Sequence, residues 1–496
     1  MSPAFPHPVP VPKGGEALDE ISHLKVLLAG DNKVKVAGID ADGLLRGKII
    51  SKAKFLAVAT AGFGMSSALF GWDMHDVIHT TSTTYNAKEG GFSDFIATPD
   101  LRSFRRIPWE SNIPLFLLQF SMGGKPVMPC SRSILKAKCN ELRQYGYQAK
   151  AGVELEFVNY QTPSEDGYAA GSQSQPRNLA AFLNKSAPNQ LRPLSDGMFG
   201  YSLTRISAAK EYFMHIFDAS EAFGCGIESW HTESGPGVFE AALTVSNIDD
   251  MADKVSLFKY LAKSLGQEHG ATPCFMAKPT FGLPGNSGHI HLSLVDSVTG
   301  KNAFARDEID PNAPWSDIAW LSDTGRYFLA GVLEALWDIM PLLAPTVNSY
   351  KRLVENYWAP VHLSWGLEDR LASVRLITPP TCMAKATRFE VRIPGADLHP
   401  HHALSALMAA GLRGVQKKLR LALPPLSARP ANSPLPEVLP NSLEAAVARF
   451  VAPDSIAREL FGDEFVEYYA ATREHELRCW REAVTDWEFK RYIETV

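Results

Sequence analysis

At 496 residues the chain is longer than one ordinary domain, so we expect two or more domains. Hydrophobic residues make up 45% and charged residues 21% of it, which is a globular composition and excludes a disordered or fibrous chain. The formal net charge of −5 argues against a nucleic-acid partner, because no basic field is available to neutralise phosphates.

The cysteines and the apolar segments indicate the compartment. The 6 cysteines are scattered without a C-x-x-C pair, which predicts neither a disulfide framework nor a zinc site and suits a reducing compartment. Residues 1–18 are rich in proline and lack the apolar core of a signal peptide, so we expect a disordered tail. The longest apolar run, around Ile113–Met122, is far shorter than the roughly 20 residues that span a bilayer. We therefore expect a cytoplasmic protein with no membrane partner.

The segment that follows the tail predicts a small mixed sheet with helices. Leu18–Leu28 has helical spacing of its apolar residues, and Val34–Asp40 alternates like a strand. The pair Asp42-Gly43 predicts a turn into a second strand at Leu44–Ile50, so the two strands should form a hairpin.

The rest of the chain predicts helices that alternate with short strands. A helix is expected at Ser131–Tyr147, and a strand at Gly152–Val158 follows it directly. The polar stretch Gln161–Gly200 holds few apolar residues, which indicates a surface loop or excursion. Near the C-terminus the spacing predicts two helices, Ser455–Tyr469 and Glu474–Thr495.

Three expected strands each collect polar side chains on a single face. Residues two apart in a strand point to the same side, and their neighbours point to the other. The strands group Glu154 with Glu156, His289 with His291 and Ser293, and Arg388 with Glu390 and Arg392. A wet outer face explains any one such strand, but three of them together indicate a common site.

The acids in this set indicate a cation, and the arginines indicate an anion. Glu233 and Glu240 add two more carboxylates around a Gly-Pro-Gly turn. Carboxylates that point the same way repel each other unless a cation lies between them. Because oxygen ligands dominate, with a single imidazole, we expect Mg²⁺ or Mn²⁺ and not zinc. Arginines beside such acids favour a phosphate or carboxylate substrate, and the chain has no G-x-x-x-x-G-K-[ST] loop, which excludes P-loop nucleotide binding.

Five ordered motifs resemble the glutamine synthetase family, specifically its bacterial-type branch, from about Val36 to the C-terminus. They lie at residues 153–157, 231–240, 278–293, 348–353 and 388–392. The resemblance implies an α+β protein with a β-grasp-like N-terminal domain at 19–125 and a catalytic domain at 126–496. In the catalytic domain, antiparallel strands would form an open funnel flanked by helices. The resemblance also implies homo-oligomeric rings based on hexamers, with the dodecamer as an alternative, and sites shared between neighbouring subunits.

The resemblance assigns roles by position. Ligands of a first metal ion correspond to Glu156, Glu233 and Glu240, and those of a second ion, on the nucleotide side, to Glu154, His289 and Glu390. The positions around ATP correspond to Glu228, His291, Ser293, Arg375, Lys385 and Arg388. The positions for glutamate and phosphate transfer correspond to Gly285, Arg352, Arg370 and Arg392, with Ser67 and Tyr201 as further substrate contacts. The implied reaction has two steps: the γ-carboxylate of glutamate attacks the terminal phosphate of ATP, and an amine then displaces phosphate.

Two departures from the family lie in its ammonium pocket. Trp358 stands where ammonia-using members carry a glutamate, and Gly64 stands where a Phe-Asp-Gly-Ser-Ser motif has its aspartate. Losing a positioned base typically costs roughly 10²–10⁴ in rate, and the lost charge should weaken the binding of NH₄⁺. Trp358 adds apolar surface and a π face, which suit an organic amine. The γ-glutamylputrescine synthetases, a branch of this family, likewise carry an aromatic residue there, so the sequence favours a γ-glutamyl-amine ligase.

Two alternatives remain open. An ammonia-using glutamine synthetase would need another group to replace the two missing acids. A non-catalytic relative could serve a structural or signalling role, but it would have no physical reason to keep six mutually repelling ligand groups. The histidines of the His399-Pro400-His401-His402 segment are expected to be surface or packing residues and not metal ligands.

Overall fold

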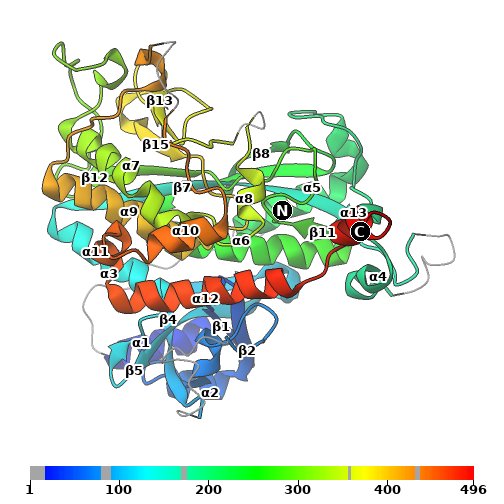
Figure 1. Cartoon of the computed structure of the whole chain (residues 1–496). Coiled ribbons are helices and arrows are strands. Elements are labelled where there is room, and N and C mark those ends of the chain that lie inside the picture. The colour runs from blue at the N-terminus through cyan, green and yellow to red at the C-terminus, as the bar shows by residue number, and fades with distance from the viewer. Residues whose placement is uncertain (1–16, 80–90, 169–175, 356–358, 431–435) are drawn as a thin grey trace.

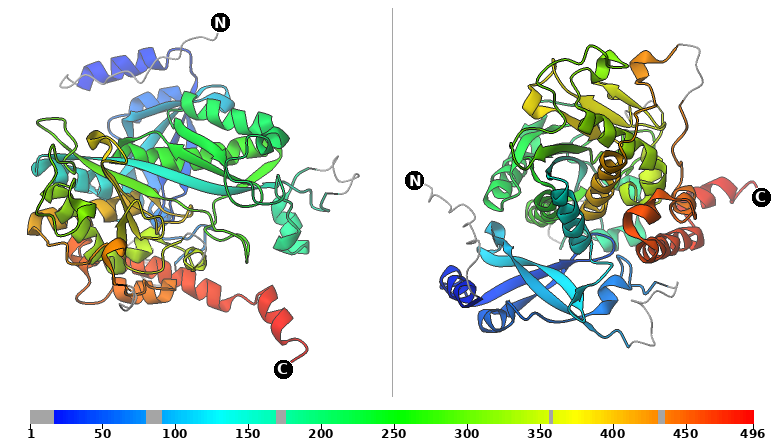
Figure 2. Two further views of the ribbon diagram at one scale, coloured as in Figure 1. Left: turned by 90° about the horizontal axis from the view of Figure 1, so that it is seen from above. Right: turned by 90° about the vertical axis from the view of Figure 1, so that its left-hand side faces the viewer.

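The computed structural model describes residues 17–79, 91–168, 176–355, 359–430 and 436–496. Two sheets organise these residues, the first between residues 33 and 126 and the second between 147 and 391. Figure 1 shows the first sheet, mostly in blue, below the rest of the molecule, and Figure 2 shows the same separation from the side. The two sheets with their flanking helices confirm the expected α+β class. Among the described helices, none has the length and apolarity that a membrane crossing requires.

The first sheet is built on the hairpin that the sequence predicts. β1 (Lys33–Ile39) and β2 (Leu45–Ser51) pair antiparallel through a turn in which Gly43 has a φ of 86°, a conformation that favours glycine. β1 also pairs parallel with β5 (Ile113–Met122), so the sheet is mixed, with strand order β2-β1-β5-β4-β3 and β6 beside β5. The other elements of this part are α1 (Ala17–Leu27), α2 (Lys52–Val58), β3 (Phe63–Ser66), β4 (Asp94–Ile107) and β6 (Lys125–Pro126).

The second sheet is centred on the long strand β7 (Tyr147–Gln161), which extends beyond the predicted strand at both ends. The strand order is β13-β14-β15-β12-β7-β9-β8, with β10 and β11 also paired to β7. All of these pairs are antiparallel except β13 with β14. The strands are β8 (Ile227–Thr232), β9 (Val238–Leu243), β10 (Ser246–Asn247), β11 (Ala271–Cys274), β12 (Ile290–Asp296), β13 (Trp365–Leu367), β14 (Val374–Ile377) and β15 (Arg388–Val391).

Buried helices pack beside this sheet and against one another. α7 (Asp323–Leu343) and α9 (Pro400–Lys417) approach each other closely, because a Cβ added at Gly331 would lie 2.7 Å from Gly414 Cα. Only glycine permits two helix backbones to come this close. The other helices are α3 (Ser131–Gln144), α4 (Leu179–Lys185), α5 (Lys210–Ala222), α6 (Ile248–His269), α8 (Ser349–Arg352), α10 (Leu443–Phe450), α11 (Ile456–Phe461), α12 (Asp463–Glu482) and α13 (Asp486–Tyr492).

One prediction about local structure was wrong. The expected helix break between residues 469 and 474 falls inside α12, and the chain breaks instead at Gly462, whose φ is 81°, and again after Glu482. A continuous buried face that includes Tyr469, Thr472 and Arg473 keeps α12 helical through the predicted break. The polar stretch 161–200, expected as a surface loop or excursion, is mostly exposed or partly exposed in its described residues and contains the short helix α4. The domain limits at 18/19 and 125/126 stay predictions, and residues 1–16 of the expected tail lie outside the described residues.

The histidines at the start of α9 pack in the interior, one of the two settings that we expected. His399, His401 and His402 are each at most 2% exposed. His401 Nε2 lies 2.9 Å from Asp253 Oδ1, and Arg132 Nε donates to the same oxygen at 2.8 Å. Burial, followed by the neighbouring His401 and Arg473, lowers the pKa of His402 to about 3, and burial lowers the pKa of His399 well below its ordinary value.

We predict that these histidines make the fold sensitive to acid. A histidine whose pKa falls on folding stays neutral in the folded protein, while the unfolded chain binds a proton below about pH 6.5. Stability is therefore retained above that pH and lost as pH falls toward about 3. His402→Phe, which keeps a ring beside Phe465 and Tyr469, should reduce the slope of unfolding free energy against pH by an amount that is small at pH 7 and approaches about 1.4 kcal/mol per pH unit near pH 5.

Urea denaturation between pH 5 and 7 measures this slope. His23→Gln alters an exposed histidine of α1 and should keep the wild-type slope. An unchanged slope in His402→Phe would contradict the prediction.

Candidate active site

Strand register brings the predicted acids onto one face of the second sheet. Directly opposite residues of neighbouring strands project to the same side. Glu156 of β7 lies opposite Glu240 of β9, and Glu240 lies opposite His231 of β8. These three side chains therefore form one row across three strands.

A second row lies further along β7 on the same face. Gly152 of β7 is opposite His291 of β12, and His291 is opposite Glu390 of β15. Glu390 is in turn opposite Arg375 of β14. Because Gly152, Glu154 and Glu156 alternate along β7, Glu154 stands between the two rows. The three separate strands of the sequence prediction thus share one polar face.

Glu154 and Glu390 are tied to the two histidines of the second row. Glu154 lies 3.1 Å from His289 Nδ1 through Oε2 and 3.0 Å from His291 Nε2 through Oε1. Glu390, whose side chain is 2% exposed, lies 3.4 Å from His289 Nδ1. Burial alone would raise the pKa of each carboxyl, but the histidines, and Arg392 beside Glu390, outweigh burial and lower both values.

Arginines surround this half of the site. Arg375 Nη1 donates to Glu390 Oε2 at 2.9 Å, and Arg392 pairs with the other oxygen of Glu390. Arg388 Nε donates to His291 Nδ1 at 3.2 Å. Arg352 Nη2 lies 3.4 Å from His289 Nε2, and its Nη1 donates to the carbonyl of Ile393 at 2.9 Å. The guanidinium groups are therefore held in place and can stabilise phosphate or carboxylate charge.

The other half of the site holds acids with little compensating charge. His231 Nε2 lies 3.6 Å from Glu240, and His231 Nδ1 lies 3.7 Å from Glu233. The ring of Tyr201 stacks on His231 with centroids 4.2 Å apart. Burial, followed by the charges of Glu156, Glu154 and Glu233, raises the pKa of Glu240 to about 9. A cation among these oxygens would relieve that repulsion.

Both halves fit a divalent metal ion by their donor atoms. Ligand atoms of Glu154, His291 and Glu390 lie within 4.8 Å of one another, as do those of His231, Glu233 and Glu240. Carboxylate oxygens with one imidazole match Mg²⁺ or Mn²⁺. The sequence assigned His291 to ATP and gave His231 no role. The signal for His231 was available, because it stands in the same short motif as Glu233 and Glu240.

The other residues that the sequence assigned to ATP or glutamate lie around these groups, and some of them are buried while others are exposed. A Cβ at Gly285 would lie 2.8 Å from Arg352 Cγ, so this backbone and Arg352 are in contact. Arg370 is exposed. Burial raises the pKa of the Tyr201 hydroxyl, and the positive charge of Arg370 is close enough to oppose part of that rise. Ser293 is partly buried on β12, and Glu228 and Lys385 are exposed.

Gly64 and Ser67, the two N-terminal residues that the sequence assigned to the site, do not lie in this cluster within one chain. Gly64 lies on β3 of the first sheet and Ser67 in the single helical turn that follows it, whereas β12 and β15 belong to the second sheet. Ser67 is 7% exposed and donates its backbone N–H to Ser93. A Cβ built at Gly64 would clash with the carboxylate of Asp94 on the neighbouring strand β4. Asp94, which the sequence did not single out, thus places an acid beside Gly64; Trp358 lies outside the described residues.

Comparisons with known proteins agree with this geometry. The family model "Glutamine synthetase, catalytic domain" matches residues 128–492. Type-1 glutamine synthetase 2 of Dictyostelium discoideum is 40% identical over 467 residues, covering 93% of this chain and 84% of that protein. Glutamate–isopropylamine ligase of a Pseudomonas species is 31% identical over 466 residues, covering 93% and 95%. The solved structure of a GmaS–ADP complex shares the fold, with a TM-score of 0.74, 23% identity and coverage of 95% and 99%.

The chain therefore belongs to the glutamine synthetase family. It is a ligase that forms a carbon–nitrogen bond from glutamate.

We predict that Glu240 matters for metal binding and little for folding without metal. With its pKa near 9, Glu240 keeps a proton at neutral pH when no cation is present, so Glu240→Gln should leave the melting temperature in EDTA almost unchanged. The amide cannot supply an anionic ligand, so stabilisation by Mn²⁺ should require at least about tenfold more metal. Thermal melts across a Mn²⁺ titration measure this, with the exposed Glu308→Gln as the matched control. Equal Mn²⁺ dependence in wild type and Glu240→Gln would contradict the assignment.

Proposed function

We propose that the protein uses ATP to activate the γ-carboxylate of glutamate as an acyl phosphate and then transfers the γ-glutamyl group to an organic amine. The polar face of the second sheet is the observation that carries the activation step. Acids, histidines and arginines from β7, β12, β14 and β15 converge there with hydrogen bonds between them. The proposed assembly is a ring of identical subunits.

Activation requires two anions to meet, and this face is suited to that task. A carboxylate is a poor electrophile until phosphate is attached to it, so ATP and glutamate must be held with reacting oxygens and phosphorus aligned. Arg352 and Arg392 are 4% and 5% exposed, so their charges act in a partly desolvated setting where they are stronger. Two Mg²⁺ or Mn²⁺ ions held by Glu154, Glu156, Glu233, Glu240, His289 and Glu390 would neutralise the phosphate charge.

The ATP side of the proposal rests on the residues at the β14–β15 edge. Arg388, Arg375 and His291 form a contiguous basic group beside Glu390, which suits the phosphates of a nucleotide. Ser293, Lys385 and Glu228 would add contacts further along the same nucleotide. Arg370 and Gly285 would position glutamate beside Arg352, with Tyr201 next to them.

The choice of an organic amine rests on the altered ammonium pocket. Gly64 carries no acid, and Trp358 replaces the glutamate that would take a proton from ammonium. The similarity to a relative named for isopropylamine supports the same choice. The finer resemblance to γ-glutamylputrescine synthetases, also carried by Trp358, favours an amine with an extended carbon chain.

A second candidate is the ordinary reaction with ammonia. Asp94 favours it, because this carboxylate occupies the space in front of Gly64 and could replace the lost aspartate. The 40% identity to a protein named a glutamine synthetase also supports it.

Phosphate release measured with ATP, Mg²⁺, glutamate and a panel of amines tests the proposal. We predict that at least one organic amine gives a higher kcat/KM than ammonium. Ammonium equal to or better than every organic amine would overturn the organic-amine assignment and support the second candidate. No phosphate release with any amine would overturn both.

Asp94→Asn tests whether the Asp94 carboxylate contacts the amine substrate. If the carboxylate meets a positively charged amine, removing its charge should lower kcat/KM for that amine by about tenfold, the effect of one hydrogen bond to a charged group. The KM for ATP should stay unchanged. Glu20→Gln, an exposed acid of α1, provides the matched control. Unchanged amine kinetics in Asp94→Asn would remove Asp94 from the amine pocket.

A further inference from the structure

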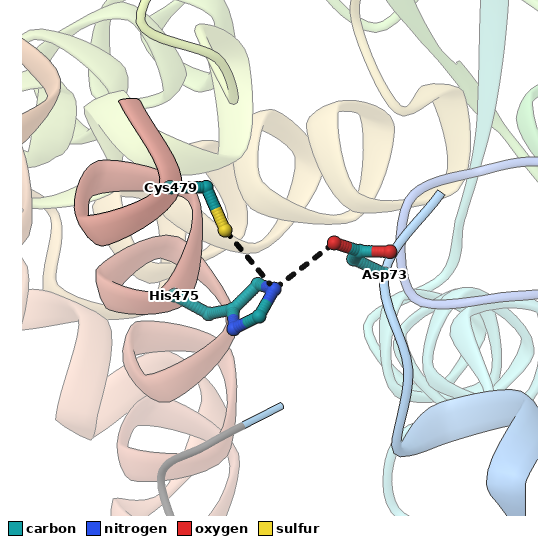
Figure 3. Close-up of side chains that lie close together, drawn as sticks. All are labelled: Asp73, His475 and Cys479. Carbon is teal, nitrogen blue, oxygen red and sulfur yellow. Dashed lines mark hydrogen bonds and ion pairs between the residues drawn. The ribbon is translucent and has the colours of Figure 1, made fainter. Parts of the chain in front are cut away.

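A second group of metal-ligand side chains lies outside the active site. Asp73 follows the first sheet's β3, whereas His475 and Cys479 lie on α12, about 400 residues later in the chain, and Figure 3 shows the three converging. His475 Nε2 is 3.0 Å from Asp73 Oδ2 and 3.5 Å from Cys479 Sγ. Their ligand atoms all lie within 4.8 Å of one another.

The local structure holds these side chains in their positions. Asp73 Oδ1 accepts hydrogen bonds from the backbone N–H groups of His75 at 2.8 Å and Val77 at 3.0 Å, which leaves Oδ2 facing His475. His475 and Cys479 are four residues apart on α12 and therefore lie on the same helix face. The His475 side chain is 3% exposed, and the ring of His79 packs edge-on against it with centroids 5.1 Å apart.

The contacts do not have the form of a proton relay. A relay from acid to histidine to thiol uses both ring nitrogens, one facing the acid and the other facing the thiol. Here the carboxylate and the thiol both approach Nε2, as Figure 3 shows. Nδ1 is buried and has no hydrogen-bond partner among the described residues. A single proton on His475 Nε2 can form a good hydrogen bond with only one of Asp73 and Cys479. A cation between the three side chains would instead be bound by all of them.

The donor set and its spacing indicate which cation. Sulfur, nitrogen and oxygen donors together suit zinc, in contrast to the oxygen-rich active site. Zinc bonds of about 2.0–2.1 Å to nitrogen or oxygen and about 2.3 Å to sulfur place tetrahedral ligands about 3.3–3.6 Å apart. The observed separations of 3.0 Å between His475 and Asp73 and 3.5 Å between His475 and Cys479 are close to these values, and the ligand atoms of Asp73 and Cys479 lie within 4.8 Å of each other. Cys479 is exposed, so water can supply a fourth ligand.

We infer that Asp73, His475 and Cys479 bind one zinc ion, which joins the N-terminal part of the chain to α12. The site lies where other contacts also connect α12 with the N-terminal part of the chain. Tyr468 of α12 donates to the carbonyl of Phe70 at 2.9 Å, and Arg473 of α12 pairs with Asp42. A metal at this position would therefore act on the attachment of α12 and not on the reaction.

Cobalt substitution tests the site directly. Full-length protein stripped with a chelator and returned to excess Mg²⁺, which occupies the oxygen-rich site, is titrated with Co²⁺. We expect one Co²⁺ per chain with a thiolate-to-cobalt charge-transfer band, and Zn²⁺ should displace it. Cys479→Ser should abolish the band and weaken zinc binding at least about tenfold, since the thiolate is lost. Cys382→Ser, a partly exposed thiol elsewhere, should change neither.

Thermal melts supply the second readout. Zinc should raise the melting temperature of the wild type but not of Cys479→Ser, and Asp73→Asn should show a reduced rise. Because Cys479 is exposed, its replacement should leave the fold intact, which circular dichroism checks. The absence of a thiolate–cobalt band in the wild type, or its persistence in Cys479→Ser, would overturn the inference.

Discussion

Mutual repulsion among carboxylates on one face of the second sheet is the constraint on which the rest of the site depends. Glu156 and Glu240 face each other because β7 and β9 pair in one register. The alternate residues of these strands, such as Leu155, Phe157 and Ala241, are fully buried. A slip of one residue would expose that apolar surface and bury the acids. Burial of the apolar side therefore holds the charges together, and the repulsion remains available to be relieved by a cation.

The two halves of the site differ in the positive groups that offset this repulsion. Around Glu154 and Glu390 the chain supplies its own cations through Arg375 and Arg392, and His289 lies within hydrogen-bond distance of Glu154. Around Glu233 and Glu240, the ion pairs of the described residues provide only His231. The pKa directions follow this division, since they fall at Glu154 and Glu390 and rise at Glu240. The first half can thus be preorganised before any ligand arrives, whereas the second half depends on a cation from outside.

The sequence predicted what is local in this structure. Alternation along β7 was enough to place Glu154 and Glu156 together, and the Asp42-Gly43 turn was enough to predict the first hairpin. Contacts that depend on tertiary packing could not be read in the same way. A glycine within a helical pattern does not by itself reveal a break, so Gly462 was missed, and scattered cysteines gave no sign that Cys479 meets Asp73. Local spacing has no information about side chains hundreds of residues apart.

Gly64 shows how a position-by-position comparison can miscount charge. Compared by position, the chain loses an aspartate at residue 64 and gains nothing in return. In space, the carboxylate of Asp94 reaches the same place from the neighbouring strand, where Ser66 lies opposite it. An acid on β4 therefore lies beside the glycine on β3. Under the proposed reaction, the change at Trp358 replaces an acid by an aromatic ring, and the nearest acid along the sequence is Glu355. Selection between amines would then depend on shape and apolar contact at one end of the nucleophile and on charge at the other.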